Sequence, residues 1–376
     1  MFFQGGETEQ EKRAFFRDYV EKNVFPYAEE FDEIQQIPRE YFKKLANDGF
    51  LGTAVSKKYG GSALDDITLG IMHEEFGRGY GSVENAITVY GMVCRPLSRL
   101  GTKAQKEKYL PKVVSGEWIP AIGITEPNAG SNMKGIETSL IEHGYHYVLN
   151  GKKRYITLAQ IADFYIIIAK LGDLPTACII DRDTKGLSVS PILGLLGLRA
   201  NMLAELNFDN CVIPKESILG KPGDGIRYVA GFALNEGRFT TACGALGIAQ
   251  GCLELSMKRA KERIQFDMPL MKHELVQKML TEMITSIEAA RGVCQKAARL
   301  REEGEPEAVQ QTLIAKYLAS QAAVQAGSHA VSIHGASGCT ENSAAQRGYR
   351  DAKIMELIEG STQIYEEIIP KGYQMK

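Results

Sequence analysis

The spacing of apolar residues changes twice along the chain, which predicts three structural segments. In the first, residues 8 to about 117, apolar residues such as Phe15, Tyr19 and Val24 recur at roughly helical intervals among charged ones. A helix is expected over 39–47, because Pro38 precedes it and Gly49 follows it. This segment therefore predicts an N-terminal helical domain. Its further helices are expected over 65–77, 83–100 and 105–114.

The second segment, from about Trp118 to 225, contains short runs rich in β-branched and aromatic residues. Glycine, asparagine and aspartate separate these runs, and the Asn150-Gly151 pair is typical of a hairpin turn. The pattern predicts a small antiparallel β domain. Its expected strands are 145–149, 164–169, 177–181, 187–189 and 204–208.

The third segment keeps a helical apolar period over long stretches, which predicts an antiparallel helical bundle. Its helices are expected over 226–266, 270–303, 308–333 and 342–357. Small residues in the first of these helices would let its neighbours approach closely; they are Ala242, Gly244, Ala245, Gly247 and Ala249. The sequence thus predicts an α+β fold, mainly α. The expected domains are a helical domain at 1–117, a β domain at 118–225 and a helical bundle at 226–376.

Composition and charge narrow the class of protein. The 376 residues are 44% hydrophobic with a net charge of -2, which is typical of a soluble protein and argues against nucleic acid as the main partner. No run of about 18 apolar residues occurs, so no membrane span is expected, and the N-terminus does not resemble a signal peptide. Seven scattered cysteines without a CxxC pair predict buried thiols in a reducing cytoplasm. The histidines form no metal-binding pattern, so no metal site is expected.

Glu359 stands out as a candidate catalytic base near the C-terminus. Apolar residues frame it on both sides, and Gly360 can adopt backbone angles that other residues avoid. Ser361 or Thr362 could then cap a new helix, so Glu359 would lie on a helix–loop–helix corner. Burial would raise its pKa and make it a usable general base near neutral pH. Taken alone, a glutamate before a glycine is more often an exposed hinge.

Two polar stretches in the β domain suit a planar cofactor that carries phosphate. Residues 124–132 combine hydroxyls, amides and a glycine that could surround an anion, although a polar surface loop would look the same. Residues 149–157 place the aromatic ring of Tyr155 two positions before the hydroxyl of Thr157. A flat ring beside a hydroxyl suits a heteroaromatic group.

Together with Glu359, these stretches resemble the acyl-CoA dehydrogenase superfamily of flavoproteins. The similarity covers nearly the whole chain, in the family's order and spacing. It includes 59–61 with 74–75, 101–116, 196–199 with 205–209, 247–250, 263–266 with 276–277, and 350–354 leading into 359–361. The resemblance implies a helical domain, a middle antiparallel β barrel and a C-terminal four-helix bundle. It also implies a homo-oligomer, more often a tetramer than a dimer, with FAD bound across a subunit interface.

The resemblance also assigns roles to individual residues. Thr125 and Ser131 would contact the flavin ring and the pyrophosphate region, and Thr157 would lie near the reactive nitrogen of the ring. Arg263 and Phe266 would reach the FAD of the neighbouring subunit, where a guanidinium suits pyrophosphate. The implied FAD-binding set is Ile122, Ile124, Thr125, Ser131, Tyr155, Ile156, Thr157, Arg263, Gln265, Phe266, Gly335, Ser361 and Gln363. The implied substrate contacts are Ser131, Asn235, Arg238 and Gly360.

The implied reaction is the α,β-dehydrogenation of a short or medium acyl thioester of CoA. Glu359 would remove the α proton while the β hydrogen leaves as hydride to FAD, and an electron-transfer flavoprotein or another acceptor would take the electrons. A minority of the family carries the base directly before the arginine that corresponds to Arg238, but here that position is Gly237. Glu236 is one residue away, which turns it by about 100° on a helix. It therefore remains a reserve candidate.

Several departures from the family pattern leave FAD binding expected but the thioester carrier open. Asn132 and Asn235 stand where aspartates are usual, Tyr155 replaces a frequent tryptophan, Ser361 a threonine and Ser332 a glutamine, and 336–339 replaces a more glycine-rich turn. The alternative substrate is an acyl or aminoacyl group on a carrier protein in a biosynthetic pathway. A flavin monooxygenase or oxidase is disfavoured, since a monooxygenase needs no α-proton base. A non-catalytic binding protein is disfavoured by the joint presence of Glu359, Thr157 and Arg263.

Overall fold

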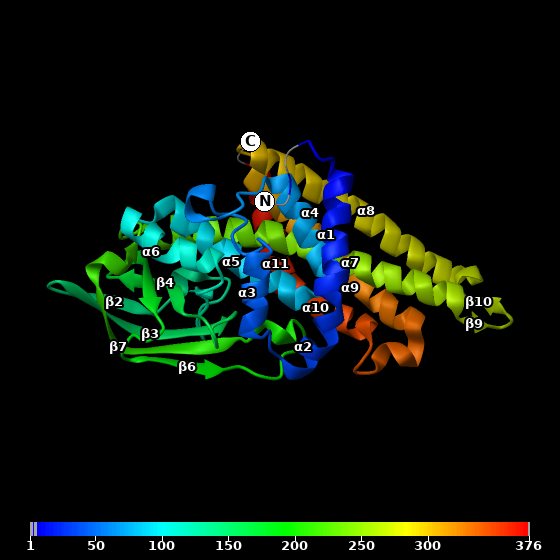
Figure 1. Cartoon of the computed structure of the whole chain (residues 1–376), viewed down its shortest axis with the longest axis horizontal. Coiled ribbons are helices and arrows are strands. Elements are labelled where there is room, and N and C mark those ends of the chain that lie inside the picture. The colour runs from blue at the N-terminus through cyan, green and yellow to red at the C-terminus, as the bar shows by residue number, and fades with distance from the viewer. Residues whose placement is uncertain (1–2, 4–5, 375–376) are drawn as a thin grey trace.

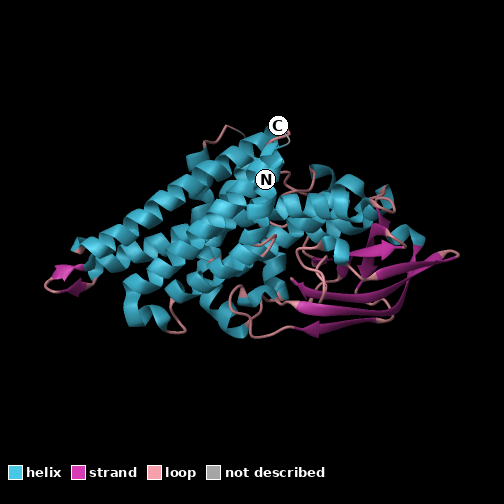
Figure 2. Cartoon of the chain, turned by 180° about the vertical axis from the view of Figure 1, so that it is seen from behind, coloured by secondary structure: helices cyan, strands magenta, loops and turns pink. Residues whose placement is uncertain are grey.

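The computed structural model describes residue 3 and residues 6–374, and it contains the three expected segments (Figures 1 and 2). The helix predicted between Pro38 and Gly49 is confirmed at both ends. Two other helices begin with a threonine that caps the helix reciprocally with a residue three positions later. The N-terminal helices are α1 (Glu9–Asn23), α2 (Ala28–Ile34), α3 (Arg39–Asn47), α4 (Asp66–Gly79), α5 (Gly81–Leu100) and α6 (Lys103–Val114).

The middle segment forms an eight-stranded sheet in the order β6-β7-β3-β2-β4-β5-β8, with β1 beside β4. The five expected strands are present, and the short strands β1, β2 and β8 were not predicted. The strands are β1 (Pro120–Gly123), β2 (Ser139–His143), β3 (His146–Ile156), β4 (Phe164–Leu171), β5 (Leu174–Asp181), β6 (Leu187–Pro191), β7 (Ala204–Pro214) and β8 (Ile218–Leu219).

Two strand pairings are parallel, within a sheet whose other pairings are antiparallel as the sequence predicted. β1 pairs with the first half of β4, where Pro120 lies opposite Phe164, and β2 pairs with its end, where Ser139 lies opposite Lys170. β1 and β2 therefore follow one another along the same edge of β4. The polar loop between them leaves the sheet and rejoins it in the same direction, which a tight hairpin cannot do.

The Asn150-Gly151 pair is not the hairpin turn that the sequence suggested. β3 runs through it, and its register against β7 shifts between Leu149 and Gly151, which marks a β-bulge. Gly151 has φ 137°, and a Cβ there would lie 2.6 Å from the Cα of Thr138. Glycine is therefore required by this close approach, while the turn between β2 and β3 lies at Gly144.

The C-terminal segment is a helical bundle, but the sequence placed one boundary wrongly. Residues 263–266 were expected in a helix, whereas they leave α7 and enter a hairpin whose turn residues Phe266 and Asp267 have φ of 49° and 60°. Pro269 lacks an amide hydrogen and cannot continue the helix. The elements are α7 (Gly231–Glu262), β9 (Ile264–Gln265), β10 (Met268–Pro269), α8 (Glu274–Glu303), α9 (Ala308–His334), α10 (Ala344–Leu357) and α11 (Thr362–Gln374).

α7 is the central helix, and α4, α5, α8, α9 and α10 all pack against it. Its glycines bring its backbone against that of α4, as the sequence predicted: a Cβ on Gly247 would collide with the carbonyl oxygen of Glu74, and one on Gly77 with that of Gly244. Six of the seven cysteines are buried, as expected, and Cys339 is exposed. No helix of residues 6–374 is long and apolar enough to cross a membrane.

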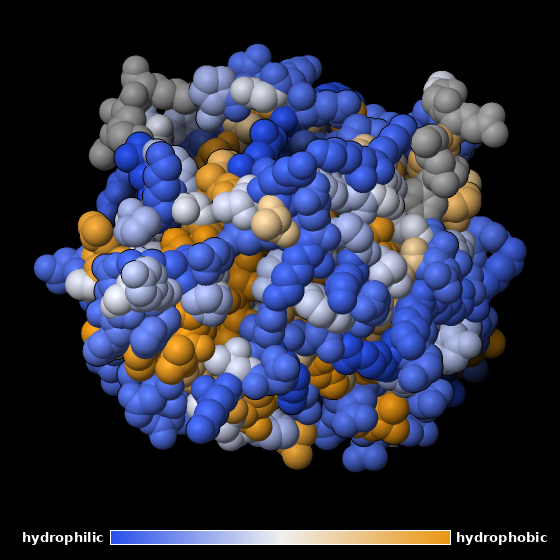
Figure 3. All heavy atoms as spheres, turned by 60° about the vertical axis from the view of Figure 1, so that its left-hand side comes forward, coloured by the Kyte–Doolittle hydropathy of each residue, from blue (hydrophilic) through white to orange (hydrophobic). Residues whose placement is uncertain are grey.

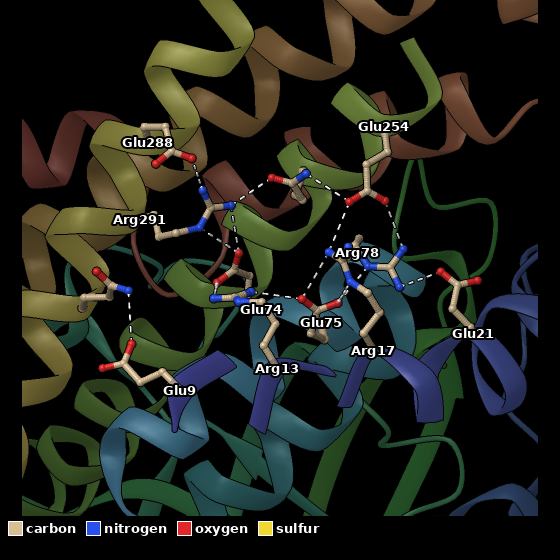
Figure 4. Close-up of polar contacts among 12 residues, drawn as sticks. Glu9, Arg13, Arg17, Glu21, Glu74, Glu75, Arg78, Glu254, Glu288 and Arg291 are labelled. Carbon is tan, nitrogen blue, oxygen red and sulfur yellow. Dashed lines mark hydrogen bonds and ion pairs between the residues drawn. The ribbon is translucent and has the colours of Figure 1, made fainter. Parts of the chain in front are cut away.

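A network of charged side chains joins α1, α4 and α8 (Figure 4). Arg13 Nη2 lies 2.7 Å from Glu74 Oε2, and Arg17 Nε lies 3.0 Å from Glu75 Oε2. Arg291 from α8 reaches the other oxygen of Glu74 at 3.0 Å. Since both glutamates are buried, loss of any of these arginines would leave a desolvated carboxylate short of partners.

The close contact between α4 and α7 predicts that Gly247→Ala destabilises the protein. The added methyl has no room against the α4 backbone, so the free energy of unfolding should fall by about 1–3 kcal/mol or more. Gly292→Ala is the control, because Gly292 lies in α8 with open space around it and should stabilise by roughly 0.4–1 kcal/mol. Denaturant unfolding of both variants checks this, and equal midpoints would contradict it.

Candidate active site

Glu359 lies on the corner between α10 and α11, as the sequence predicted. The unusual backbone angles expected at Gly360 are present, with φ 118°, but Glu359 itself also has a positive φ of 58°. A non-glycine residue in the left-handed region is uncommon and persists only where its surroundings hold it there. The corner therefore presents the Glu359 side chain in a conformation that a free chain would avoid.

The carboxylate of Glu359 is buried against α5 and α7. Its Oε2 is sealed from solvent and has no hydrogen-bond partner among the described residues, although part of the residue's surface remains accessible. A Cβ on Gly237 would lie 2.8 Å from this oxygen and 2.8 Å from the Met92 sulfur, so the carboxylate requires glycine at this position. Burial raises the pKa of Glu359 to about 7, against the opposing influence of the positive charges of Arg238 and Lys316.

Three buried or half-buried side chains hold the backbone of the corner. Arg238 Nε donates to the Glu359 carbonyl oxygen at 3.1 Å, and the Tyr365 hydroxyl donates to the same oxygen at 3.0 Å. Lys316 donates to the carbonyl oxygens of Glu356 at 2.9 Å and Gly360 at 2.8 Å. Sequence reasoning missed Lys316 and Tyr365, because only the packing of α9 and α11 brings them to the corner.

Glu236 has the opposite environment, although it is adjacent in sequence to Gly237. Its carboxylate lies 2.9 Å from Arg95 and 2.7 Å from Arg301. Burial alone would raise its pKa, but the two guanidiniums outweigh that effect and hold the pKa of Glu236 below its usual value. Glu236 is therefore a paired, ionised group with little capacity to accept a proton. The nearby Asn235, an expected substrate contact, accepts a hydrogen bond from Arg301 through its carbonyl oxygen at 3.2 Å.

The two polar stretches of the β domain lie side by side. The Arg154 amide donates to the Thr125 carbonyl oxygen at 2.9 Å, and the buried ammonium of Lys153 donates to Glu126 at 2.6 Å and to Ile124 at 3.0 Å. Glu126 also accepts from the amides of residues 137 and 138, which closes the loop. The pairing of Lys153 with Glu126 could have been suspected from the sequence. In a strand, alternate side chains point to opposite faces, so Lys153 points away from the face of its neighbours Lys152 and Arg154.

Tyr155 is presented on a second bulge of β3, where the register against β7 shifts between Lys153 and Ile156. It has φ 59° and is 54% exposed, while Ser131 in the neighbouring loop is also exposed. Ile122 and Ile156 are buried beneath this surface, and Thr157 is half-buried. Tyr155 and Ser131 are thus exposed on the two stretches for which the sequence predicts cofactor binding.

The sheet side of the molecule has apolar atoms in recesses between polar ridges (Figure 3). Exposed apolar side chains of the β domain include Tyr155, Leu193 and Leu196. Exposed apolar surface rimmed by polar residues is typical of a binding face.

The expected cofactor-binding residues of the bundle lie in three places. Arg263, Gln265 and Phe266 are exposed on the β9–β10 hairpin, at the opposite end of the molecule from the sheet (Figures 1 and 2). Gly335, with φ 63°, ends α9 and is exposed. Ser361 and Gln363 lie at the start of α11 beside Glu359 and Gly360. A single chain therefore does not bring the hairpin to Thr125 and Tyr155.

Comparisons with known proteins agree over the whole chain. Three domain families match: acyl-CoA dehydrogenase N-terminal domain at residues 6–117, middle domain at 121–211 and C-terminal domain at 223–374. The short-chain specific acyl-CoA dehydrogenase of Clostridium acetobutylicum is 36% identical over 95% of both chains. Butyryl-CoA dehydrogenase from Megasphaera elsdenii has a TM-score of 0.93 at 32% identity, covering 100% of both chains. The prolyl acyl carrier protein oxidase AnaB has a TM-score of 0.93 at 29% identity, covering 98% of this chain and 99% of its own.

The buried carboxylate predicts that Glu359→Gln stabilises the protein above neutral pH. The folded-state pKa of about 7 lies above the ordinary value of 4.5, so the folded state binds the proton more tightly and stability falls as pH rises between these values. Gln cannot ionise and avoids this loss, so the variant should gain roughly 1–3 kcal/mol at pH 8 and little at pH 5. Denaturant unfolding at matched flavin content checks this. A difference that does not depend on pH would contradict it.

Proposed function

The chain belongs to the acyl-CoA dehydrogenase family, whose members are FAD-dependent flavoproteins and oxidoreductases acting on CH–CH groups, and we propose that it forms the α,β double bond of a short or medium acyl-CoA. The observation that carries this proposal is the buried Glu359 carboxylate, whose Oε2 has no hydrogen-bond partner among the described residues and whose pKa burial raises to about 7. Such a group can accept a proton from carbon near neutral pH.

The chain's own residues hold and move the proton. Bound FAD would accept the β hydrogen as hydride. Glu359 Oε2 would take the α proton, whose acidity the thioester carbonyl raises. Arg238 and Tyr365 fix the backbone of Glu359, so the carboxylate is positioned before the substrate arrives. Glu359 Oε2 lies close to Gly237 and is buried from water, which raises its basicity.

FAD would be held by residues of two subunits. Thr125, Ser131, Tyr155 and Thr157 would bind the flavin and pyrophosphate of one cofactor. The exposure of Ser131 and Tyr155 and the partial exposure of Thr125 and Thr157 support this assignment. Arg263 and the other hairpin residues would serve a neighbouring subunit's FAD, because they are exposed far from their own chain's loop (Figure 1). This assignment requires a homo-oligomer, and we propose a tetramer.

A carrier-protein thioester is the second candidate substrate, with acyl or aminoacyl groups both included. The similarity to the prolyl acyl carrier protein oxidase supports it, as do the departures at Asn132 and Asn235. An electron-transfer flavoprotein would reoxidise the reduced FAD, and the cytoplasm is the proposed location. Matched CoA and carrier-protein thioesters, tested for bleaching of the oxidised flavin, separate the two substrate classes.

Glu359→Gln tests the base. The variant should retain FAD and bind an acyl thioester, but flavin reduction by substrate should fall by at least ~10²- to 10⁴-fold, because the proton acceptor is lost. Stopped-flow bleaching of the oxidised flavin measures this rate with the better thioester.

Glu236→Gln is the matched control. It removes a buried carboxylate next to Gly237 in sequence, but one that already forms ion pairs with two arginines. It should change the reduction rate much less and mainly lower stability. If Glu359→Gln reduced at nearly the wild-type rate while Glu236→Gln did not, the base would lie on α7.

Arg263→Ala tests the shared cofactor site. Removing this guanidinium should weaken FAD retention and loosen the oligomer together, because both depend on the hairpin reaching a neighbouring subunit. Flavin content and mass by light scattering measure the two effects. Lys261→Ala, which removes a neighbouring exposed charge, should change neither. A fully flavinylated Arg263→Ala variant of unchanged mass would rule out the shared site.

A further inference from the structure

Lys316 is a fully buried lysine whose ammonium spans the corner that carries Glu359. It lies in α9, its side chain has no exposed surface, and it donates to the carbonyl oxygens of Glu356 and Gly360 at 2.9 and 2.8 Å. One acceptor precedes Glu359 by three residues and the other follows it directly. A lysine is rarely buried without a specific set of partners, and here those partners are the two ends of one turn.

The turn at Glu359 and Gly360 has a strained backbone that neighbouring contacts must stabilise. Glu359 and Gly360 have φ of 58° and 118°, and left-handed residues other than glycine persist only where contacts over-determine them. Lys316 holds the carbonyls on either side, while Arg238 and Tyr365 hold the carbonyl of Glu359 itself. Without Lys316, two buried acceptors would lose their donor.

The ammonium also acts on charge. Four groups face it: Glu356 from α10, Glu359 from the corner, Arg238 from α7, and the Tyr365 ring of α11 at 5.1 Å from the Lys316 nitrogen. The two glutamates favour its charged form, whereas burial and Arg238 oppose it, and burial lowers the pKa of Lys316 to about 7. Lys316 and Glu359 therefore titrate in the same range, each favouring the charged form of the other.

We propose that Lys316 is a positioning residue for the base: it fixes the left-handed corner that places the Glu359 carboxylate against Gly237, and its ammonium stabilises the ionised form that accepts the proton. The inference rests on the proposed function and deepens it. Lys316 acts through Glu359, because its ammonium is bound to backbone carbonyls.

Lys316→Met tests both parts of the proposal. Met fills the space of the lysine stem but supplies neither donors nor charge. In the holoenzyme, we expect unchanged flavin content, KM within a few-fold of wild type, and a flavin reduction rate lower by roughly 10²-fold, the size of effect that misplacing a catalytic group produces. The apparent pKa of the reduction rate should move upward, because loss of a nearby positive charge favours the protonated carboxyl.

Lys316→Arg and Lys353→Met complete the design. Arg restores the charge and the donors, so it should return the apparent pKa towards that of wild type and recover part of the rate; it also keeps the test available where Met prevents folding. Lys353 contacts the Glu356 carboxylate from the surface and is bound to no corner carbonyl, so Lys353→Met should leave rate and pH profile unchanged.

A Lys316→Met holoenzyme with the wild-type rate and pH profile would overturn the proposal. The proposal would also be overturned if Lys316→Arg had the same pH profile of flavin reduction as Lys316→Met. A variant with a raised KM but an unchanged rate of flavin reduction would overturn it as well. These outcomes are distinct from failure of the proposed function, which is decided by Glu359→Gln. If Glu359→Gln is inactive while Lys316→Met behaves as wild type, only the role of Lys316 is wrong.

Discussion

The desolvated carboxylate of Glu359 is the constraint on which the functional structure depends. A carboxyl in water ionises far below neutral pH, and bringing its pKa to about 7 requires burial without a full set of partners. α7 can lie against the carboxylate because Gly237 has no side chain, and the Met92 sulfur of α5 lies on the same side of Gly237. This arrangement is unfavourable by itself. The close packing of α4 on α7 and the charged network across α1, α4 and α8 supply the stability that offsets it.

Two glutamates near the same glycine have different environments, and this difference separates the proposed base, Glu359, from the paired Glu236. Glu236 is bonded by Arg95 and Arg301, and its proton affinity is lowered. Glu359 also lies near two positive groups, Arg238 and Lys316. These two side chains donate hydrogen bonds to backbone carbonyl oxygens of the corner. The carboxylate therefore receives a long-range charge without a hydrogen bond, which leaves a lone pair available for a proton from carbon. Divergent environments of this kind separate the roles of paired carboxylates in general.

The sequence predicted the helices and turns that depend on residues close together along the chain. The helical period located α3 and the long bundle helices, and the position of Glu359 followed from its apolar frame and the glycine after it. The short strand β1 was not predicted because its partner is β4, a segment distant in sequence. Residues 263–266 were wrongly predicted as helical. The two left-handed residues of their hairpin turn are Phe266 and Asp267, and neither is a glycine that would have indicated a turn. Lys316 and the Lys153–Glu126 pair depend on contacts between segments distant in sequence, which periodicity does not reveal.

The hairpin carries a further consequence for assembly. Phe266 is 86% exposed and has φ 49°, and its ring packs edge-on against His273 at 6.1 Å between centroids. An isolated chain would therefore combine backbone strain with an apolar ring that lies mostly in water. A surface that covered the ring would bury this apolar area and offset the cost of the strained backbone. The expected surface is a cofactor bound to a second chain, because the hairpin lies at the opposite end of the molecule from the loop 124–138 (Figure 2). With the proposed shared site, cofactor retention and subunit association would be linked by mass action, so that each would stabilise the other.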